Sequence, residues 1–410
     1  MNAAATDPHG PAPWPHALLD VAALRRAGAR PVPFRQFVLK VHSRCNLACT
    51  YCYVYHGADS SWRSRPHRVG DEVLRRTAHR IAEHVAAHDL TQIRVELHGG
   101  EPLLSGPGTP VRVASLVRGA VHEAVGKRCA VRVSVQTNGT LLTERTLSEL
   151  AAADIGIGVS LDGGAPHHNT SRVDHAGRPS WPAVTRGLRR LARYPASYAG
   201  ILCTVDLAHD PVETYASLLA FDPPAIDLLL PHANWAAPPP GIADPHAAHR
   251  ATPYADWLAA AFDAWFDADR AAVRVRLFTE VIGLLLGVPS AAEAMGISPL
   301  AAVVVDTDGA VEQVDSLKTA YEGAPVMGLH VDRNSFDDAL EHPGTAARQL
   351  GMRALAPSCR TCPVVRVCGG GNYAHRYRPG SGFRHPSVYC ADLAAFIRHV
   401  DARLQRVLVA

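Results

Sequence analysis

The sequence has no apolar run long enough to cross a membrane and no excess of charge of one sign. Its 410 residues include 41 Lys or Arg and 38 Asp or Glu, for a formal net charge of +3. A membrane-spanning helix needs ~20 consecutive apolar residues, and the start MNAAATDPHGPAPWPHALL lacks the basic and apolar regions of a secretion signal. Because basic and acidic residues are interspersed, neither a nucleic acid nor a membrane surface is expected as a partner. These absences favour a cytoplasmic protein.

The sequence also lacks the regular cysteine pattern of a disulfide framework. Hydrophobic residues make up 47% of the chain, enough for a large core in two to three units. The nine cysteines are odd in number and mostly fall into two groups, which suits metal ligation better than disulfides. Cys129 and Cys203 stand alone and are expected to be buried apolar residues. The grouped cysteines are Cys45, Cys49, Cys52, and then Cys359, Cys362, Cys368 and Cys390.

Apolar strand-like runs alternate with helical patterns from Phe34 onward. In residues 71–87, for example, Leu74, Ala78, Ile81 and Val85 share one face of a predicted helix. Strands that alternate with helices predict a parallel sheet, either an incomplete barrel or a wound sheet. The predicted strands are QFVLKV, QIRVEL, VRVSVQ, IGIGVSL, GILCTV and IDLLL.

Short polar and glycine-rich motifs follow four of these strands. CNLACTYC follows the first, HGGEP (98–102) the second, QTNGT (136–140) ends the third, and SLDGG (160–164) ends the fourth. The carboxyl ends of parallel strands share one rim, where a ligand can lie against exposed backbone. We therefore expect one small-molecule site on this rim.

The three cysteines of CNLACTYC have the spacing CxxxCxxC. Iron-sulfur clusters normally take four cysteines, so three thiolates leave one iron open to a small chelating ligand. In that case Glu101 is a candidate to hold an ammonium group nearby. The alternative is a zinc site completed by His42 or His56, although zinc sites more often pair two CxxC-like segments.

Taken together, the four rim motifs resemble the radical S-adenosylmethionine (SAM) superfamily. The resemblance implies a partial (β/α)6 TIM-like barrel, a [4Fe-4S] cluster on Cys45, Cys49 and Cys52, and SAM on its open iron. It also implies homolysis of SAM to a 5'-deoxyadenosyl radical, with the cofactor carrying the chemistry. The residues that it places near SAM are Gly99, Gly100 and Glu101 at the methionyl end, Asn138, Ser160, Asp162 and Arg172 near the ribose or carboxylate, and Tyr51 and Tyr53 near the adenine.

The second cysteine group resembles the SPASM extension of radical SAM peptide maturases, a small domain that holds auxiliary clusters. Its four cysteines would complete one auxiliary [4Fe-4S] cluster with no open iron, although a structural zinc site fits four cysteines too. In a full SPASM domain two further positions carry cysteine. Here Val314 and Asn372 occupy them, which implies that one auxiliary cluster is absent.

Five segments between Phe34 and Cys390 are informative together: RCNLACTYCYVY, VELHGGEPLL, LLLPHANW, DSLK and CGGGNYAHRY. With them, this core most resembles the cyclophane-forming peptide maturases. By likeness, such an enzyme abstracts a Cβ hydrogen from a ribosomally made precursor peptide and joins that carbon to an aromatic ring two positions away. Asp315 is the candidate base, and a solvated turn residue is the alternative. His232, Asn234 and Trp235 of PHANW are candidates for peptide contact, although Trp235 also fits simple packing.

Several alternatives remain open from the sequence. One is a sulfatase-maturing enzyme, another a thioether-forming maturase, and a third a non-catalytic zinc-binding interaction protein. The expected partners of the catalytic alternatives are a precursor peptide or protein and an electron donor such as a flavodoxin or ferredoxin. No separate peptide-recognition domain is evident, so the peptide would add to a sheet edge or need a partner protein.

The predicted domain boundaries follow these motifs. The expected units are an Ala- and Pro-rich arm (1–33), the radical SAM partial barrel (34–235), a helical linker (236–295), a SPASM-like auxiliary cluster domain (296–392) and a C-terminal helix (393–410).

Overall fold

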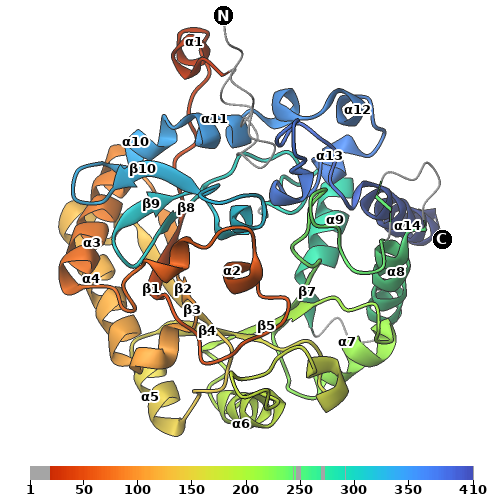
Figure 1. The fold of residues 1–410 in the computed structure, drawn as a ribbon, viewed down its shortest axis with the longest axis horizontal. Coiled ribbons are helices and arrows are strands. Elements are labelled where there is room, and N and C mark those ends of the chain that lie inside the picture. The colour runs from red at the N-terminus through yellow and green to blue at the C-terminus, as the bar shows by residue number, and fades with distance from the viewer. Residues whose placement is uncertain (1–18, 243, 246–250, 269–272, 291, 410) are drawn as a thin grey trace, which may run out of the picture.

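The protein is described by a computed structural model that covers residues 19–242, 244–245, 251–268, 273–290 and 292–409. One sheet of ten strands runs through it in the order β10-β9-β8-β1-β2-β3-β4-β5-β6-β7. Figure 1 shows this sheet at the centre with helices around it. The first eighteen residues of the predicted N-terminal arm lie outside the described part of the chain.

Strands β1 to β6 are parallel neighbours and form the predicted partial barrel. Their bounds agree with the six predicted apolar runs to within a few residues. Apolar residues mark these strands in the sequence because side chains of each strand are buried in the core. The strands are β1 (Gln36–His42), β2 (Gln92–Gly99), β3 (Ala130–Thr137), β4 (Ile155–Ser160), β5 (Tyr198–Thr204) and β6 (Ala225–Leu229).

Helices α3 to α7 lie around the outside of the sheet, whereas α2 lies at its centre (Figure 1). The predicted face of α3 is confirmed, since Leu74, Ala78, Ile81 and Val85 are all buried. The isolated Cys129 and Cys203 are buried as expected. The helices of this half are α1 (Val21–Arg26), α2 (Tyr53–His56), α3 (Asp71–Ala87), α4 (Gly108–Val125), α5 (Glu144–Ala152), α6 (Trp181–Leu191) and α7 (Pro211–Leu219).

The sheet continues beyond the six predicted strands at both ends. β7 (Arg274–Val275) extends it from β6, and β8 (Ala302–Val305) pairs in parallel with β1. β9 (Ala310–Glu312) and β10 (Val326–His330) complete an antiparallel meander. The predicted auxiliary domain is thus joined to the barrel through a shared sheet.

Helices account for most of the remaining C-terminal part. In the predicted linker, α8 and α9 pack with the long C-terminal α14, so this segment belongs to the core. The helices are α8 (Pro253–Phe266), α9 (Arg276–Leu285), α10 (Phe336–Leu340), α11 (Pro343–Gln349), α12 (Pro357–Arg360), α13 (Val365–Cys368) and α14 (Cys390–Val409).

Candidate active site

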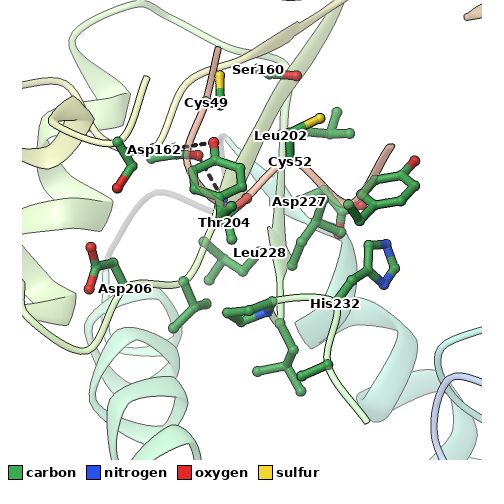
Figure 2. Close-up of a pocket in the computed structure, with 18 of the residues that line it drawn as sticks. Cys49, Cys52, Ser160, Asp162, Leu202, Thr204, Asp206, Asp227, Leu228 and His232 are labelled. Carbon is green, nitrogen blue, oxygen red and sulfur yellow. Dashed lines mark hydrogen bonds between the residues drawn. The ribbon is translucent and has the colours of Figure 1, made fainter. Parts of the chain in front are cut away.

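A cavity of about 720 Å³ opens at the carboxyl ends of the barrel strands. Cys45, Cys49 and Cys52 line it together with residues of the other rim motifs. Figure 2 shows Cys49 and Cys52 beside Ser160 and Asp162 on the cavity wall. The prediction that the four motifs meet on one rim is therefore confirmed by the fold.

The segment that carries Cys45, Cys49 and Cys52 (residues 42–52, the cysteine loop) is held in place by backbone hydrogen bonds to two other rim segments. Ala48 N–H donates to Val173 O at 2.7 Å, and Thr50 N–H donates to Ser171 O at 3.0 Å. On the other side, Gly100 N–H donates to His42 O at 2.8 Å. The loop position is thus set by the backbone, and the cysteine side chains remain available to line the cavity.

Gly99 and Gly100 allow this close approach. A Cβ atom added at Gly99 would lie 2.1 Å from His42 O, and one added at Gly100 would lie 2.4 Å from Arg44 C. Gly99 also has φ of +143°, which favours glycine. The two glycines are required by contact with the cysteine loop, whatever else they bind.

Glu101 is completely buried and already satisfied by the protein. Its carboxylate accepts hydrogen bonds from Asn138 N–H at 2.8 Å, Leu103 N–H at 2.9 Å and the Thr137 hydroxyl at 2.7 Å. Burial raises the pKa of Glu101, and these hydrogen bonds oppose that shift. Through these hydrogen bonds, the Glu101 carboxylate connects the end of β2 to the end of β3.

Tyr51, Asp162 and Arg172 form a polar group beside Cys49. Arg172 donates to the Tyr51 hydroxyl at 2.6 Å, that hydroxyl donates to Asp162, and Asp162 accepts from Thr204 N–H at 3.0 Å. Burial lowers the pKa of Arg172, but Tyr51 and Asp162 outweigh it and the net shift is upward. In the described part of the chain, Arg172 Nε is buried with no hydrogen-bond partner. A cation held in this way suits an anionic ligand in the cavity.

The three thiols have raised pKa values, as expected of buried cysteines that lose their protons when they bind a metal. Burial raises the pKa of Cys45 to about 12 and raises the pKa values of Cys49 and Cys52. Three soft donors on the wall of one cavity, near the cation of Arg172, fit a cluster with an open iron and an anionic ligand.

The floor and far wall of the cavity carry further polar and aromatic side chains. His98, Gln136 and Ser160 come from neighbouring strands, and Gln136 donates to the Ser160 hydroxyl at 2.9 Å. His98 Nδ1 is buried without a hydrogen-bond partner among the described residues. Asn138 is bonded to the cysteine loop, since its side-chain amide donates to Asn46 Oδ1 at 2.8 Å.

Tyr53, His232 and His375 line the cavity and form a contiguous aromatic wall. The Tyr53 and His232 rings are 4.6 Å apart, and the His232 and His375 rings 5.6 Å apart. His232 exposes its ring to the cavity, yet the surrounding protein desolvates it and lowers its pKa to about 4. Of the three PHANW residues predicted to contact a peptide, His232 lines the cavity and Asn234 and Trp235 do not. Asn234 is buried against Thr319, and the Trp235 indole donates to Pro386 O at 2.7 Å.

Asp315 lies behind this wall and is not among the residues that line the cavity. It is 7% exposed, which excludes a solvated turn residue, and its carboxylate is 2.7 Å from Lys40 Nζ. Lys40 is also 3.5 Å from Asp306. Burial lowers the pKa of Lys40, but the carboxylates of Asp315 and Asp306 outweigh it and raise the pKa. The lysine on β1 thus pairs two acidic residues of the C-terminal part.

The four C-terminal cysteines surround a separate cavity of about 90 Å³. Burial raises the pKa of Cys368 to about 12 and raises that of Cys359, while Cys390 is exposed at the start of α14. Four thiols around a cavity of this size fit one metal centre. Val314 and Asn372 add no thiol to it, and Asn372 lines the larger cavity instead.

Two other groups of possible metal ligands lie elsewhere in the described residues. In one, Asp337 accepts from His84 at 2.7 Å and His88 at 2.8 Å, and Phe34 N–H donates to His84 Nε2. This pair of histidines fastens α3 to α10. In the other, which contains His167, His168 and His209, Ala165 N–H donates to His168 Nδ1, which assigns the ring proton to Nε2.

The chain is similar to several known proteins. Residues 39–214 match the model of the Radical SAM superfamily. A Serine-type anaerobic sulfatase-maturating enzyme of Bacteroides thetaiotaomicron is 23% identical over 90% of this chain and 89% of its own length. A Cysteine-type anaerobic sulfatase-maturating enzyme of Clostridium perfringens is 30% identical over 42% of this chain and 44% of its own length.

Solved structures share the fold along most of the chain. Native anSMEcpe with bound AdoMet and the Cp18Cys peptide has a TM-score of 0.71 at 22% identity, covering 91% of this chain and 98% of that one. Streptococcus suis SuiB bound to the precursor peptide SuiA has a TM-score of 0.55 at 13% identity, covering 90% and 78%. The predicted fold class is confirmed. Among the described residues, no helix is long and apolar enough to span a bilayer.

Proposed function

We propose that this protein is a radical SAM enzyme that abstracts a hydrogen atom from a side chain of a peptide or protein. The observation that carries the proposal is the cysteine loop on the wall of the 720 Å³ cavity. Cys45, Cys49 and Cys52 would hold a [4Fe-4S] cluster with SAM on its open iron. When bound, these groups supply a 5'-deoxyadenosyl radical.

The residues around the cysteine loop would bind and orient SAM. The backbone of Gly99 and Gly100 and the carboxylate of Glu101 are assigned to the methionyl end. Arg172, whose Nε has no hydrogen-bond partner among the described residues, is suited to a carboxylate. The further assignments are Asn138, Ser160 and Asp162 at the ribose or carboxylate and Tyr51 and Tyr53 at the adenine.

Asp315 is proposed as the base that accepts the substrate proton. Lys40 Nζ, at 2.7 Å, fixes the position of the carboxylate. Because Asp315 lies behind the wall of Tyr53 and His232, the proton would reach it through that wall. In this position the carboxylate would accept the proton without contact with bulk water.

The first candidate reaction is the oxidation of a Ser or Cys side chain to formylglycine. Similarity to the serine-type sulfatase-maturating enzyme along 90% of this chain supports it. The second candidate is cyclophane formation, in which a Cβ radical adds to an aromatic ring and the product loses two hydrogens in total. The absence of cysteine at Val314 and Asn372 favours this second candidate.

We further propose that Cys359, Cys362, Cys368 and Cys390 hold an auxiliary [4Fe-4S] cluster. Four thiolates leave no iron open, so this site would serve electron transfer or structure. A zinc ion is the alternative for the same donors.

Reductive cleavage of SAM tests the proposal most directly. Anaerobically reconstituted protein is reduced with dithionite in the presence of SAM, and 5'-deoxyadenosine is measured by mass spectrometry. The C45A/C49A/C52A variant is the matched control and should form none. Zinc content with no 5'-deoxyadenosine from the wild type would instead indicate a non-catalytic zinc-binding protein.

Three synthetic peptides then separate the candidate reactions. The first contains Phe and, two positions later, Ser; the second has Leu in place of Phe; the third has Cys in place of Ser. Formylglycine and cyclophane products of the Ser peptide both lose two hydrogens, so a hydrazide probe for aldehydes distinguishes them. An aldehyde in both Ser peptides supports oxidation, whereas a Phe-dependent loss without aldehyde supports cyclisation. Consumption of the Cys thiol without an aldehyde indicates a thioether.

A further inference from the structure

Positive charge is concentrated around the second cysteine group. Residues 342–391 contain seven arginines and no Lys, Asp or Glu. Because the whole chain has a net charge of +3 and this segment +7, the remainder carries −4. The expectation that charge is evenly interspersed is therefore wrong for this segment.

Five of these arginines are exposed, and three of them flank the cysteines. Arg360 lies between Cys359 and Cys362 in the sequence, Arg366 precedes Cys368, and Arg353 precedes α12. Among the described residues, none of Arg353, Arg360 and Arg366 forms an ion pair with a carboxylate. The other two exposed arginines are Arg378 and Arg384, and the buried ones are Arg348 and Arg376.

Within the described part of the chain, two carboxylates from neighbouring elements bind other groups. Glu293 pairs with the buried Arg348. Asp392, in the first turn of α14, is 1% exposed and accepts from Tyr254 N–H at 3.0 Å. Neither carboxylate approaches the exposed arginines through any ion pair among the described residues.

The cavity at the cysteines is too small for a peptide but reaches the surface. It measures about 90 Å³, and one of its lining thiols, that of Cys390, belongs to an exposed residue. A cluster with four thiolate ligands has no free coordination position. What can pass between such a centre and a partner is an electron.

We infer that this basic face, defined by Arg353, Arg360 and Arg366 around the second cysteine group, is the docking surface for an acidic one-electron carrier protein of the flavodoxin type. The inference rests on the proposed auxiliary cluster. It goes beyond that proposal by stating where the redox partner binds and which charge it carries. Complementary charge raises association rates and fixes orientation, and salt weakens it.

Binding of an acidic flavodoxin, measured by calorimetry on the reconstituted protein in increasing NaCl, tests the surface. R360E/R366E reverses two charges at the site, and R186E/R189E makes the same change on exposed positions of α6. We expect the first variant to weaken binding about tenfold or more at low salt and the second to change it less than about twofold. Equal weakening in both variants would mean a general charge effect and overturn the inference.

A second measurement separates docking from the identity of the metal. In the C45A/C49A/C52A background only the auxiliary site can hold iron, and reduced flavodoxin should bleach its visible absorbance. Adding R360E/R366E should slow the bleaching about tenfold at low salt while iron content stays the same. If the site holds iron but R360E/R366E does not slow the bleaching, the docking surface alone is overturned. If the site holds zinc in place of iron, the auxiliary cluster and this inference are overturned together. A synthetic polyglutamate that binds as tightly as flavodoxin would indicate a nonspecific anion site.

Discussion

The two cysteine sites of this molecule differ in almost every physical respect. The first has three thiols on the wall of a 720 Å³ cavity, in a loop held by backbone hydrogen bonds to two neighbouring rim segments. The second has four thiols around a cavity of about 90 Å³, which lies close to the surface and is flanked by arginines. An incomplete donor set beside a large cavity suits a reactive centre, whereas a complete set beside a small one suits a centre that only exchanges electrons or holds the fold. The volume of the neighbouring cavity, as well as the number of thiols, therefore distinguishes a reactive centre from one that exchanges electrons or stabilises the fold.

The largest expected effect comes from removing the first site alone. The C45A/C49A/C52A variant should keep about four of about eight irons and lose SAM cleavage by at least roughly a thousandfold. Iron analysis and 5'-deoxyadenosine yield measure both. A variant with no iron and about one zinc would show that the second site is a structural zinc centre.

The ion pair behind the first site should contribute more to stability than its neighbours on the surface. K40M leaves Asp315 buried without its cation and leaves Asp306 with Arg65, at 3.8 Å. We expect a loss of about 3–5 kcal/mol in the free energy of unfolding. K127M, at an exposed position, should cost less than about 0.5 kcal/mol. Denaturant unfolding provides the values. If the pair is coupled, K40M/D315N will cost less than the sum of the single variants.

Backbone contact at the first site can be tested with one methyl group. In G100A the new Cβ would overlap Arg44 C at 2.4 Å, so the cysteine loop must move. We expect a loss of about 2–3 kcal/mol together with weaker iron retention by the first site. G70A places its methyl group in open space at the N-cap of α3 and should cost a few tenths of a kcal/mol. Equal melting temperatures for the two variants would contradict this prediction.

His375 provides the smallest effect and connects the two regions, since it lies between Cys368 and Cys390 in the sequence and lines the first cavity. Burial holds its pKa well below 6.5. Below pH 6.5 the unfolded chain therefore binds a proton that the folded chain does not, and stability falls on acidification. H375Q should reduce this loss by about 1–2 kcal/mol between pH 7 and pH 5. H122Q, at an exposed position, serves as the control, and an equal change there would refute the assignment.

Local patterns predicted the barrel and its rim well. The six apolar runs became β1 to β6, and the motifs at their ends met on one cavity. This succeeded because strand burial and the shared edge of parallel strands follow from short segments of sequence.

Long-range contacts were not predictable in the same way. Nothing in the sequence around Asp315 indicates that Lys40 pairs with it, because the two residues meet only when β8 and β9 join the sheet beside β1. The aromatic wall has the same origin, since His232 and His375 come from segments far apart in the chain. PHANW and CGGGNYAHRY gave a signal that these segments matter, but not that they touch.

The place of β1 in the sheet has a consequence for how the chain can be made. Gln36 pairs with Arg94 on one side and with Ala302 on the other. One edge of β1 therefore stays unpaired during synthesis until β8, much later in the chain, has been made. Until then it presents unpaired backbone groups and a hydrophobic face, which are hazards for aggregation. A truncated chain that ends near residue 235 would retain this open edge permanently. We expect such a fragment to aggregate, and the ribosome-bound nascent chain to need protection by a chaperone until β8 has emerged.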